Sequence, residues 1–170
     1  MYQAILKLVP GDYENKDAIQ NGIHYIYRLD SPNPLQVFCY NGLQYPPTCQ
    51  TLIQDFDKVH GMAVPVPSRQ LFHFILSFPP DIGLPDGCRF FIDQVAALYA
   101  TEYLVCYAYH RKGRRHNNPH FHFLISSVNY RTGQTLSMEQ LASYFSQAQK
   151  LAGDWGIGLT FINEELIHDV

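Results

Sequence analysis

Three histidines fall within a pattern typical of a β-hairpin, the stretch Tyr103–Asn129. His120 and His122 are two residues apart, so on a strand their side chains share one face. If His110 pairs with His120, then Ala108 lies opposite His122 and the three imidazoles converge. A slip of one residue would turn His110 to the other face. Three converging neutral imidazoles bind a divalent cation and leave coordination positions open for water or substrate.

The same pairing predicts an apolar surface on the other face of the hairpin. Its residues would be Val105, Tyr107, Tyr109, Phe121, Phe123 and Ile125. A His-x-His pair alone is often no more than two exposed strand histidines, and His110 on the neighbouring strand is what favours a metal site. His116, in the turn, is a competing third ligand, although it lies in a polar, solvated segment.

A run of basic residues follows His110 at the tip of the predicted hairpin. The run consists of Arg111, Lys112, Arg114 and Arg115. Most short charge runs are solvated turns, and that interpretation stays open here. The alternative is a phosphate clamp next to the metal site, because cationic side chains supply most of the affinity for a nucleic-acid backbone.

The composition is that of a globular chain that forms one domain over residues 1–170. Of the 170 residues, 46% are hydrophobic and 16% are charged, enough for a core and unlike a disordered chain. The net charge of -3 argues against bulk nucleic-acid binding but permits a local basic patch. The four cysteines show no C-x-x-C spacing, the first ten residues lack a secretory signal, and no apolar run reaches membrane-spanning length. We therefore expect a reduced cytoplasmic protein without membrane contact.

An early segment, 15–28, has the periodicity of an amphipathic helix. Its apolar stripe is made of Ile19, Ile23 and Ile26. Tyr27 flanks this stripe and has an obvious use in packing. Tyr25 projects away from the stripe, over Ala18 and Gly22. From spacing alone, Tyr25 is best explained as an ordinary half-exposed tyrosine.

The remaining segments complete an α+β pattern, in which helices pack on a mainly antiparallel sheet. We predict strands at 2–9, 71–78 and 157–162, the last at a sheet edge, and helices at 51–60, 88–100 and 137–152. The rest of 31–68 is rich in Pro, Asn and Gly and predicts a long loop. Ser137 and Gln140 form a capping-box pattern. His73, inside a strand, fits a buried, hydrogen-bonded histidine better than a contact of the site.

Several of these pieces together resemble a plasmid-mobilisation relaxase of the HUH superfamily of single-strand DNA endonucleases. The similar segments are Ile23–Arg28, Phe72–Pro79, His110 with Asn118–His122, and Ser126–Gly133. They occur in the family order and span residues 18–136. The Asn-Pro-His-x-His element with its tail is the specific part. One departure is that Arg111 and Lys112 follow His110, where relatives often have an acidic residue.

The resemblance implies roles for individual residues. Tyr25 would be the nucleophile that attacks a DNA phosphodiester, with Tyr27 as the fallback. The metal ligands would be His110, His120 and His122, and the cofactor Mn²⁺ or Mg²⁺. Asp81 and His73 are candidates for a general base or for orienting a histidine, although Asp81 is also explained as a turn residue.

The implied partner is single-stranded DNA resembling an origin of transfer, bound by the basic run and by base stacking, with accessory mobilisation proteins as further partners. Two alternatives stay open. A replication initiator or transposase of the same superfamily would share the chemistry. A DNA-binding module that keeps the fold without cutting would share neither the nucleophile nor the need for metal.

Overall fold

The computed structural model describes residues 2–28, 37–39, 47–80, 88–110 and 118–163. Six strands form one sheet in the order β2-β4-β5-β3-β1-β6. The strands are β1 (Tyr2–Leu8), β2 (Val37–Cys39), β3 (Leu71–Ser77), β4 (Val105–His110), β5 (His120–Ser126) and β6 (Ile157–Asn163). Every neighbouring pair is antiparallel except β1 and β6, which run parallel.

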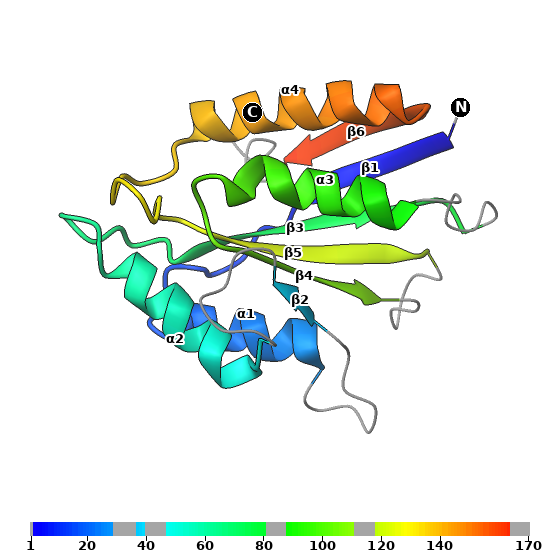
Figure 1. The fold of residues 1–170 in the computed structure, drawn as a ribbon. Coiled ribbons are helices and arrows are strands. Elements are labelled where there is room, and N and C mark those ends of the chain that lie inside the picture. Colours follow the sequence, from blue (N-terminus) through cyan, green and yellow to red (C-terminus); the bar gives the residue numbers. More distant parts are fainter. Residues whose placement is uncertain (1, 29–36, 40–46, 81–87, 111–117, 164–170) are drawn as a thin grey trace.

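In the described part of the chain, four helices cover the two faces of this sheet in pairs. They are α1 (Ala18–Tyr27), α2 (Cys49–His60), α3 (Cys88–Ala100) and α4 (Met138–Asp154). Helices α3 and α4 lie over one face, and α1 and α2 lie over the other (Figure 1). The predicted α+β class, with a mainly antiparallel sheet and β6 at an edge, is confirmed.

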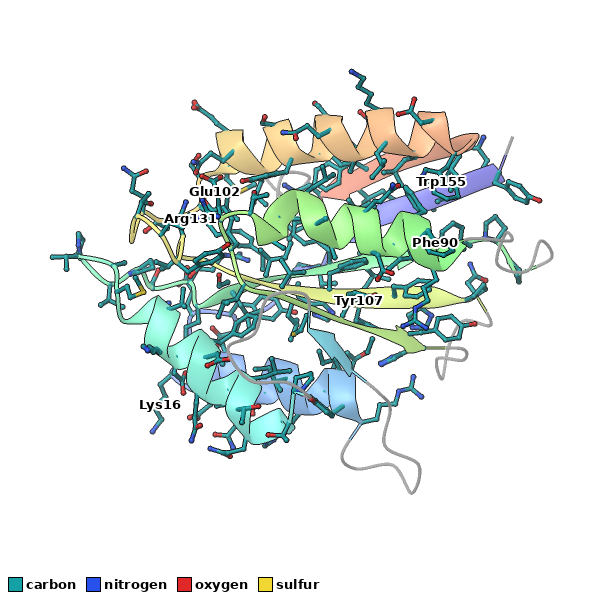
Figure 2. The ribbon with its side chains drawn as sticks, in the orientation of Figure 1. Lys16, Phe90, Glu102, Tyr107, Arg131 and Trp155 are labelled. Atoms are coloured by element: carbon teal, nitrogen blue, oxygen red, sulfur yellow. The ribbon has the colours of Figure 1, made fainter. Side chains whose placement is uncertain are left out.

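A different hydrophobic core lies between the sheet and the helices on each face. The face under α3 and α4 is rich in aromatic side chains, including Phe74, Phe91, Tyr99, Tyr107 and Phe123. Phe90 on α3 and Trp155 directly after α4, both labelled in Figure 2, are exposed and lie outside this core. The face under α1 and α2 is largely aliphatic, with Ile19, Ile23, Ile26, Leu104 and Leu124 among its buried residues. All six residues predicted for the apolar face of the hairpin belong to the aromatic-rich core, and Tyr109 is only partly buried there.

The hairpin has the predicted register. His110 pairs with His120, and Ala108 pairs with His122. Because partners in adjacent strands point to the same face, the three histidines lie together on the α1 side of the sheet. On the other side of β5, strand β3 places Ile75 opposite His122.

Several boundaries differ from the prediction for local reasons. Helix α1 begins at Ala18 rather than Asn15, because Asp12 accepts the backbone N–H groups of Glu14 and Asn15 and holds a turn there. Helix α2 begins at Cys49, where Thr48 and Thr51 form a capping box. Strand β2 lies in a segment predicted to be loop, and its three residues are too few for a periodic signal.

The capping box predicted at the start of α4 is confirmed. The Ser137 side chain accepts from the Gln140 backbone, and the Gln140 side chain accepts from the Ser137 backbone. Among the helices that the structure describes, none is long and apolar enough to cross a membrane.

Candidate active site

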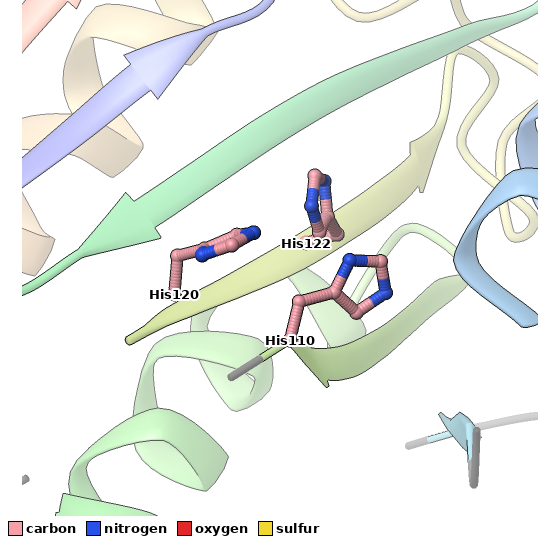
Figure 3. Close-up of side chains that lie close together, drawn as sticks. All are labelled: His110, His120 and His122. Carbon is pink, nitrogen blue, oxygen red and sulfur yellow. The ribbon is translucent and has the colours of Figure 1, made fainter. Parts of the chain in front are cut away.

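The three hairpin histidines form a cluster suited to a metal ion. One ring nitrogen from each of His110, His120 and His122 lies within 4.8 Å of the others. Figure 3 shows His120 and His122 on one strand and His110 on its neighbour. The ring centroids of His110 and His122 are 4.3 Å apart, and Ala108 opposite His122 leaves room between them.

Hydrogen bonds to backbone carbonyls identify the nitrogen that could bind metal on two of these rings. A carbonyl only accepts, so the ring nitrogen facing it carries the proton. The Nδ1 of His120 donates to the Asn118 carbonyl at 2.8 Å, which leaves the lone pair on Nε2. The Nε2 of His110 donates to the Ile26 carbonyl at 3.3 Å, which leaves the lone pair on Nδ1.

The third ring, His122, is almost fully buried, and within the described part of the chain no hydrogen-bond partner reaches its Nε2. A buried polar nitrogen without a partner is costly and calls for an explanation. A metal ion would supply that partner. The donor set therefore fits a divalent cation that accepts imidazole nitrogen, by ligand type, by count and by the orphaned nitrogen.

Burial keeps two of these imidazoles, those of His110 and His122, neutral. It lowers the pKa of His110 to about 4, helped by the nearby charge of Arg28. Burial likewise lowers the pKa of His122, and the charges of His73 and His110 add to the effect. An imidazole must be neutral to bind metal, so both groups are in the binding form at neutral pH.

A guanidinium lies at the edge of the cluster. An N–H of Arg28 donates to Nδ1 of His110 at 3.1 Å, the nitrogen that carries the lone pair. Arg28 follows the last residue of α1 and adopts a left-handed conformation, with φ of 51°. Binding of a cation by His110 therefore requires Arg28 to release this nitrogen.

A fourth histidine backs the cluster from β3. The Nε2 of His73 lies 2.7 Å from Nδ1 of His122, and Nδ1 of His73 lies 2.8 Å from the hydroxyl of Tyr13. His73 is buried, which lowers its pKa to about 4, with a further contribution from His110. His73 is thus both a buried, hydrogen-bonded residue and a neighbour of the site.

Tyr25 lies over the histidines, whereas Tyr27 contributes to the packing of the aliphatic core. The ring centroid of Tyr25 is 5.2 Å from that of His122, 5.9 Å from His73 and 6.2 Å from His110. Its side chain is 56% exposed, so substrate can reach it. Tyr27 packs against the aliphatic core, and its hydroxyl donates to the Pro47 carbonyl at 3.4 Å.

A cavity of about 290 Å³ is lined by Tyr25 and His73. Asp12, Tyr13, Asn15 and Asn21 provide its polar lining, and Ala18 and Gly22 are among its small residues. The cavity extends the site along the first turns of α1. Tyr25 therefore both lies over the histidine cluster and lines this cavity.

The remaining predicted site residues lie outside the described residues, so the roles given to them stay predictions. They are Asp81, Arg111, Lys112, Arg114, Arg115 and His116. The sequence analysis missed Tyr13 and gave Arg28 no role. Arg28 stands in the tyrosine motif and could have been found there, but the turn that holds Tyr13 has no distinguishing spacing.

The sequence matches the family model of the relaxase nuclease domain of MobA/VirD2 type over residues 25–152. The match covers three-quarters of the 170 residues, begins at Tyr25 and includes the three histidines. No curated protein matches the sequence at a significant level.

Proposed function

Because the chain belongs to the MobA/VirD2-like relaxase family, we propose that it nicks one strand of DNA at a specific site and becomes joined to the cut end, in plasmid mobilisation. The observation that carries this proposal is the position of Tyr25. Its ring lies 5.2 Å from that of His122 and within 6.2 Å of that of His110, although more than eighty residues separate it from either in sequence.

In the proposed reaction, the Tyr25 oxygen attacks the phosphorus of a phosphodiester. A bond forms between that oxygen and the 5′ phosphate, the bond to the 3′ oxygen breaks, and a 3′ hydroxyl is released. The phenol gives up its proton to solvent as the bond forms, since a neutral phenol is a weak nucleophile. The departing 3′ oxygen takes up a proton from solvent, so the proton count is unchanged. The number of phosphoester bonds is unchanged, so the released 3′ hydroxyl can reverse the reaction and reseal the strand.

The histidines would hold Mn²⁺ or Mg²⁺, which when bound polarises the phosphate oxygens and offsets the negative charge that develops on them. His110, His120 and His122 contribute no charge of their own, because neutral imidazoles leave the full charge of the ion facing the phosphate. Burial of His110 and His122 fixes their rings before substrate arrives.

Arg28 supports the same chemistry from the end of α1. A guanidinium offers several N–H donors in a planar fork that matches phosphate. On release from His110, the Arg28 side chain would be available to the phosphate that Tyr25 attacks. We assign the cavity lined by Asp12, Asn15 and Asn21 to the nucleotide next to the scissile bond.

The proposed substrate is single-stranded DNA, because an extended strand can bring one phosphate to a partly exposed tyrosine beside a cavity. Arg111, Lys112, Arg114 and Arg115 would hold the flanking backbone. Mobilisation proteins that open the duplex are the expected partners.

The test is formation of a covalent adduct. The protein is incubated with Mn²⁺ and a labelled pool of single strands that carry a randomised central segment, and adducts are separated on a denaturing gel. Wild type and Tyr27→Phe are expected to form the adduct, and Tyr25→Phe is expected to form none. Sequencing of the captured strands gives the recognition site.

Two results would change the assignment. An adduct that persists in Tyr25→Phe and disappears in Tyr27→Phe would make Tyr27 the nucleophile. Binding of the pool without any adduct, with or without Mn²⁺, would favour the DNA-binding module. In a parallel metal titration, His120→Ala is expected to bind Mn²⁺ more weakly than wild type, and equal affinity would reject His120 as a ligand.

A further inference from the structure

Resting on the metal centre of the proposed function, we propose that Tyr13 and His73 are positioning residues that determine which nitrogen of His122 faces the metal. The three side chains form a continuous chain of hydrogen bonds. His122 Nδ1 lies 2.7 Å from His73 Nε2, and His73 Nδ1 lies 2.8 Å from the Tyr13 hydroxyl. His73 and His122 are 5% and 1% exposed, so water has little access to the contact between them, whereas Tyr13 is partly exposed.

The protons along this chain are linked. A neutral imidazole carries one proton, on either Nδ1 or Nε2. For Nε2 of His122 to bind metal, its proton must be on Nδ1, from where it is donated to Nε2 of His73. His73 must then carry its own proton on Nδ1 and donate it to the Tyr13 oxygen. One arrangement of the two protons therefore makes both hydrogen bonds and leaves Nε2 of His122 unprotonated, with its lone pair available.

The opposite arrangement is poorly suited to this site. The Tyr13 hydroxyl would donate to His73, His73 would donate to His122, and His122 would carry its proton on Nε2. That nitrogen is buried, and the described residues offer it no acceptor. An unmet buried donor is destabilising, and a protonated nitrogen cannot be a ligand. Metal binding would therefore select the first arrangement, in which Tyr13 and His73 both accept.

The fold holds both residues in place for this role. Strand β3 pairs with β5 so that His73 lies opposite Leu124, diagonally beside His122 on the same face. The Tyr13 carbonyl accepts the N–H of Gln70, immediately before β3 begins. The Tyr13 hydroxyl is thus tied to the strand that carries His73. Support of this kind for a metal-binding histidine commonly changes metal affinity by 10- to 100-fold.

Three variants of the full chain separate this role from a general contribution to folding. His73→Leu removes the acceptor, His73→Gln retains an acceptor in its amide oxygen, and Tyr13→Phe removes only the terminal hydroxyl. Mn²⁺ affinity is measured by calorimetry without DNA, and folding is checked by circular dichroism. In Zn²⁺-loaded wild type, the imidazole ¹⁵N shifts report which nitrogen of each ring is protonated.

We expect His73→Leu to weaken Mn²⁺ binding by about 10- to 100-fold. His73→Gln should recover part of the loss, and Tyr13→Phe should weaken binding by about 2- to 10-fold. In the Zn²⁺-loaded protein, His73 and His122 should both be protonated on Nδ1. A His73 protonated on Nε2 in that sample overturns the proposal, as does a folded His73→Leu that binds Mn²⁺ as tightly as wild type.

These measurements are independent of DNA cleavage. If wild type binds Mn²⁺ with the expected proton positions but forms no DNA adduct, the nuclease proposal fails and the positioning roles stand. If the adduct forms while His73→Leu keeps wild-type metal affinity, only the positioning roles fail. If wild type binds neither Mn²⁺ nor Zn²⁺, the metal centre and the positioning roles fall together. If His73→Leu does not fold, the tautomer measurement and the Mn²⁺ affinity of Tyr13→Phe still test the positioning roles.

Discussion

The two faces of the central sheet are built from the same strands but serve different ends. On the face under α3 and α4, β5 contributes Phe121, Phe123 and Ile125 to an aromatic-rich core. On the face under α1 and α2, the same strand contributes Leu124 to a core and His120 and His122 to the candidate site. The side chains alternate because a strand has a period of two residues.

This difference between the two faces explains how the positions of the three histidines are fixed. Two interior strands, β4 and β5, hold the histidines, and the opposite face of each strand is locked in a packed core. A hydrophobic face that fixes the register also fixes where the imidazoles converge. Along β4 and β5, the side chains of the aromatic-rich core and the histidines of the candidate site are thus separated by face, although the histidine face also carries the aliphatic core. Neighbouring residues of one strand should therefore respond very differently to substitution.

The largest expected effect comes from substituting two adjacent residues of β5. Phe123 and His122 are both 1% exposed. Phe123→Ala should lower the free energy of unfolding by about 3–5 kcal/mol, because it empties part of the aromatic-rich core. His122→Ala should cost about 1–3 kcal/mol, since Nε2 of His73 loses its partner, yet it should abolish tight Mn²⁺ binding. Urea unfolding and calorimetry on both variants measure the two quantities.

Equal destabilisation by the two substitutions would contradict the separation by face. So would a folded His122→Ala that keeps wild-type Mn²⁺ affinity. Both unfolding curves are recorded without metal, because a ligand that binds only the folded state would add to its apparent stability.

The second prediction concerns acid. Burial lowers the pKa of His73 from 6.5 to about 4, so between these values the unfolded chain binds more protons than the folded one. The contribution of His73 to the free energy of unfolding should therefore be fully present above pH 6.5. It should fall as the pH drops toward 4, by on the order of 3 kcal/mol. His110 has a pKa lowered to about 4 and acts in the same direction. Urea unfolding at a series of pH values measures the slope.

The acid effect should also be confined to one face. Hydrogen exchange near pH 5 should show α1, which packs over the histidines, losing protection before α3 and α4. His73→Gln removes one titrating group and should flatten the pH dependence. An unchanged slope in that variant, or simultaneous loss of protection on both faces, would count against the assignment.

The hairpin, the register and the clustering of the three histidines could be predicted from sequence because they depend on local periodicity. Alternation over a few residues determined which side chains share a face, and only one register united His110 with His120 and His122. The helix that carries Ile19, Ile23 and Ile26 could likewise be predicted from the periodic spacing of these residues. The match to the relaxase family confirms the family that these motifs resembled.

What could not be predicted depends on contacts distant in sequence. Tyr13 reaches His73 across sixty residues, and Arg28 reaches His110 across eighty-two. No periodicity relates such pairs, and their meeting depends on how β3 and α1 pack. Strand β2 was missed for another reason, since its three residues are held by pairing with β4 rather than by any pattern of their own.

Gly22 shows how small a change on the histidine face should matter. Glycine inside a helix is unfavourable by propensity, but in the fold a Cβ at this position would lie 3.3 Å from a Leu71 methyl and 3.5 Å from a Leu124 methyl. The missing side chain lets α1 lie close to the sheet and carries Tyr25 toward the histidines. Gly22→Ala gains about 1 kcal/mol in helix propensity and loses part of it to crowding, so stability should change by less than about 1 kcal/mol.

Gly22→Ala should nevertheless slow adduct formation by about 2- to 10-fold, because misplacing a nucleophile by 1 Å can cost about a hundredfold and the expected shift is smaller. Gly153→Ala is the matched control on α4, where among the described residues a Cβ would meet nothing within 4 Å. It should raise the melting temperature slightly and leave adduct formation unchanged. If both variants formed adduct at the wild-type rate, the approach of α1 to the sheet would not limit the reaction, and the separation of the two faces would rest on the histidines alone.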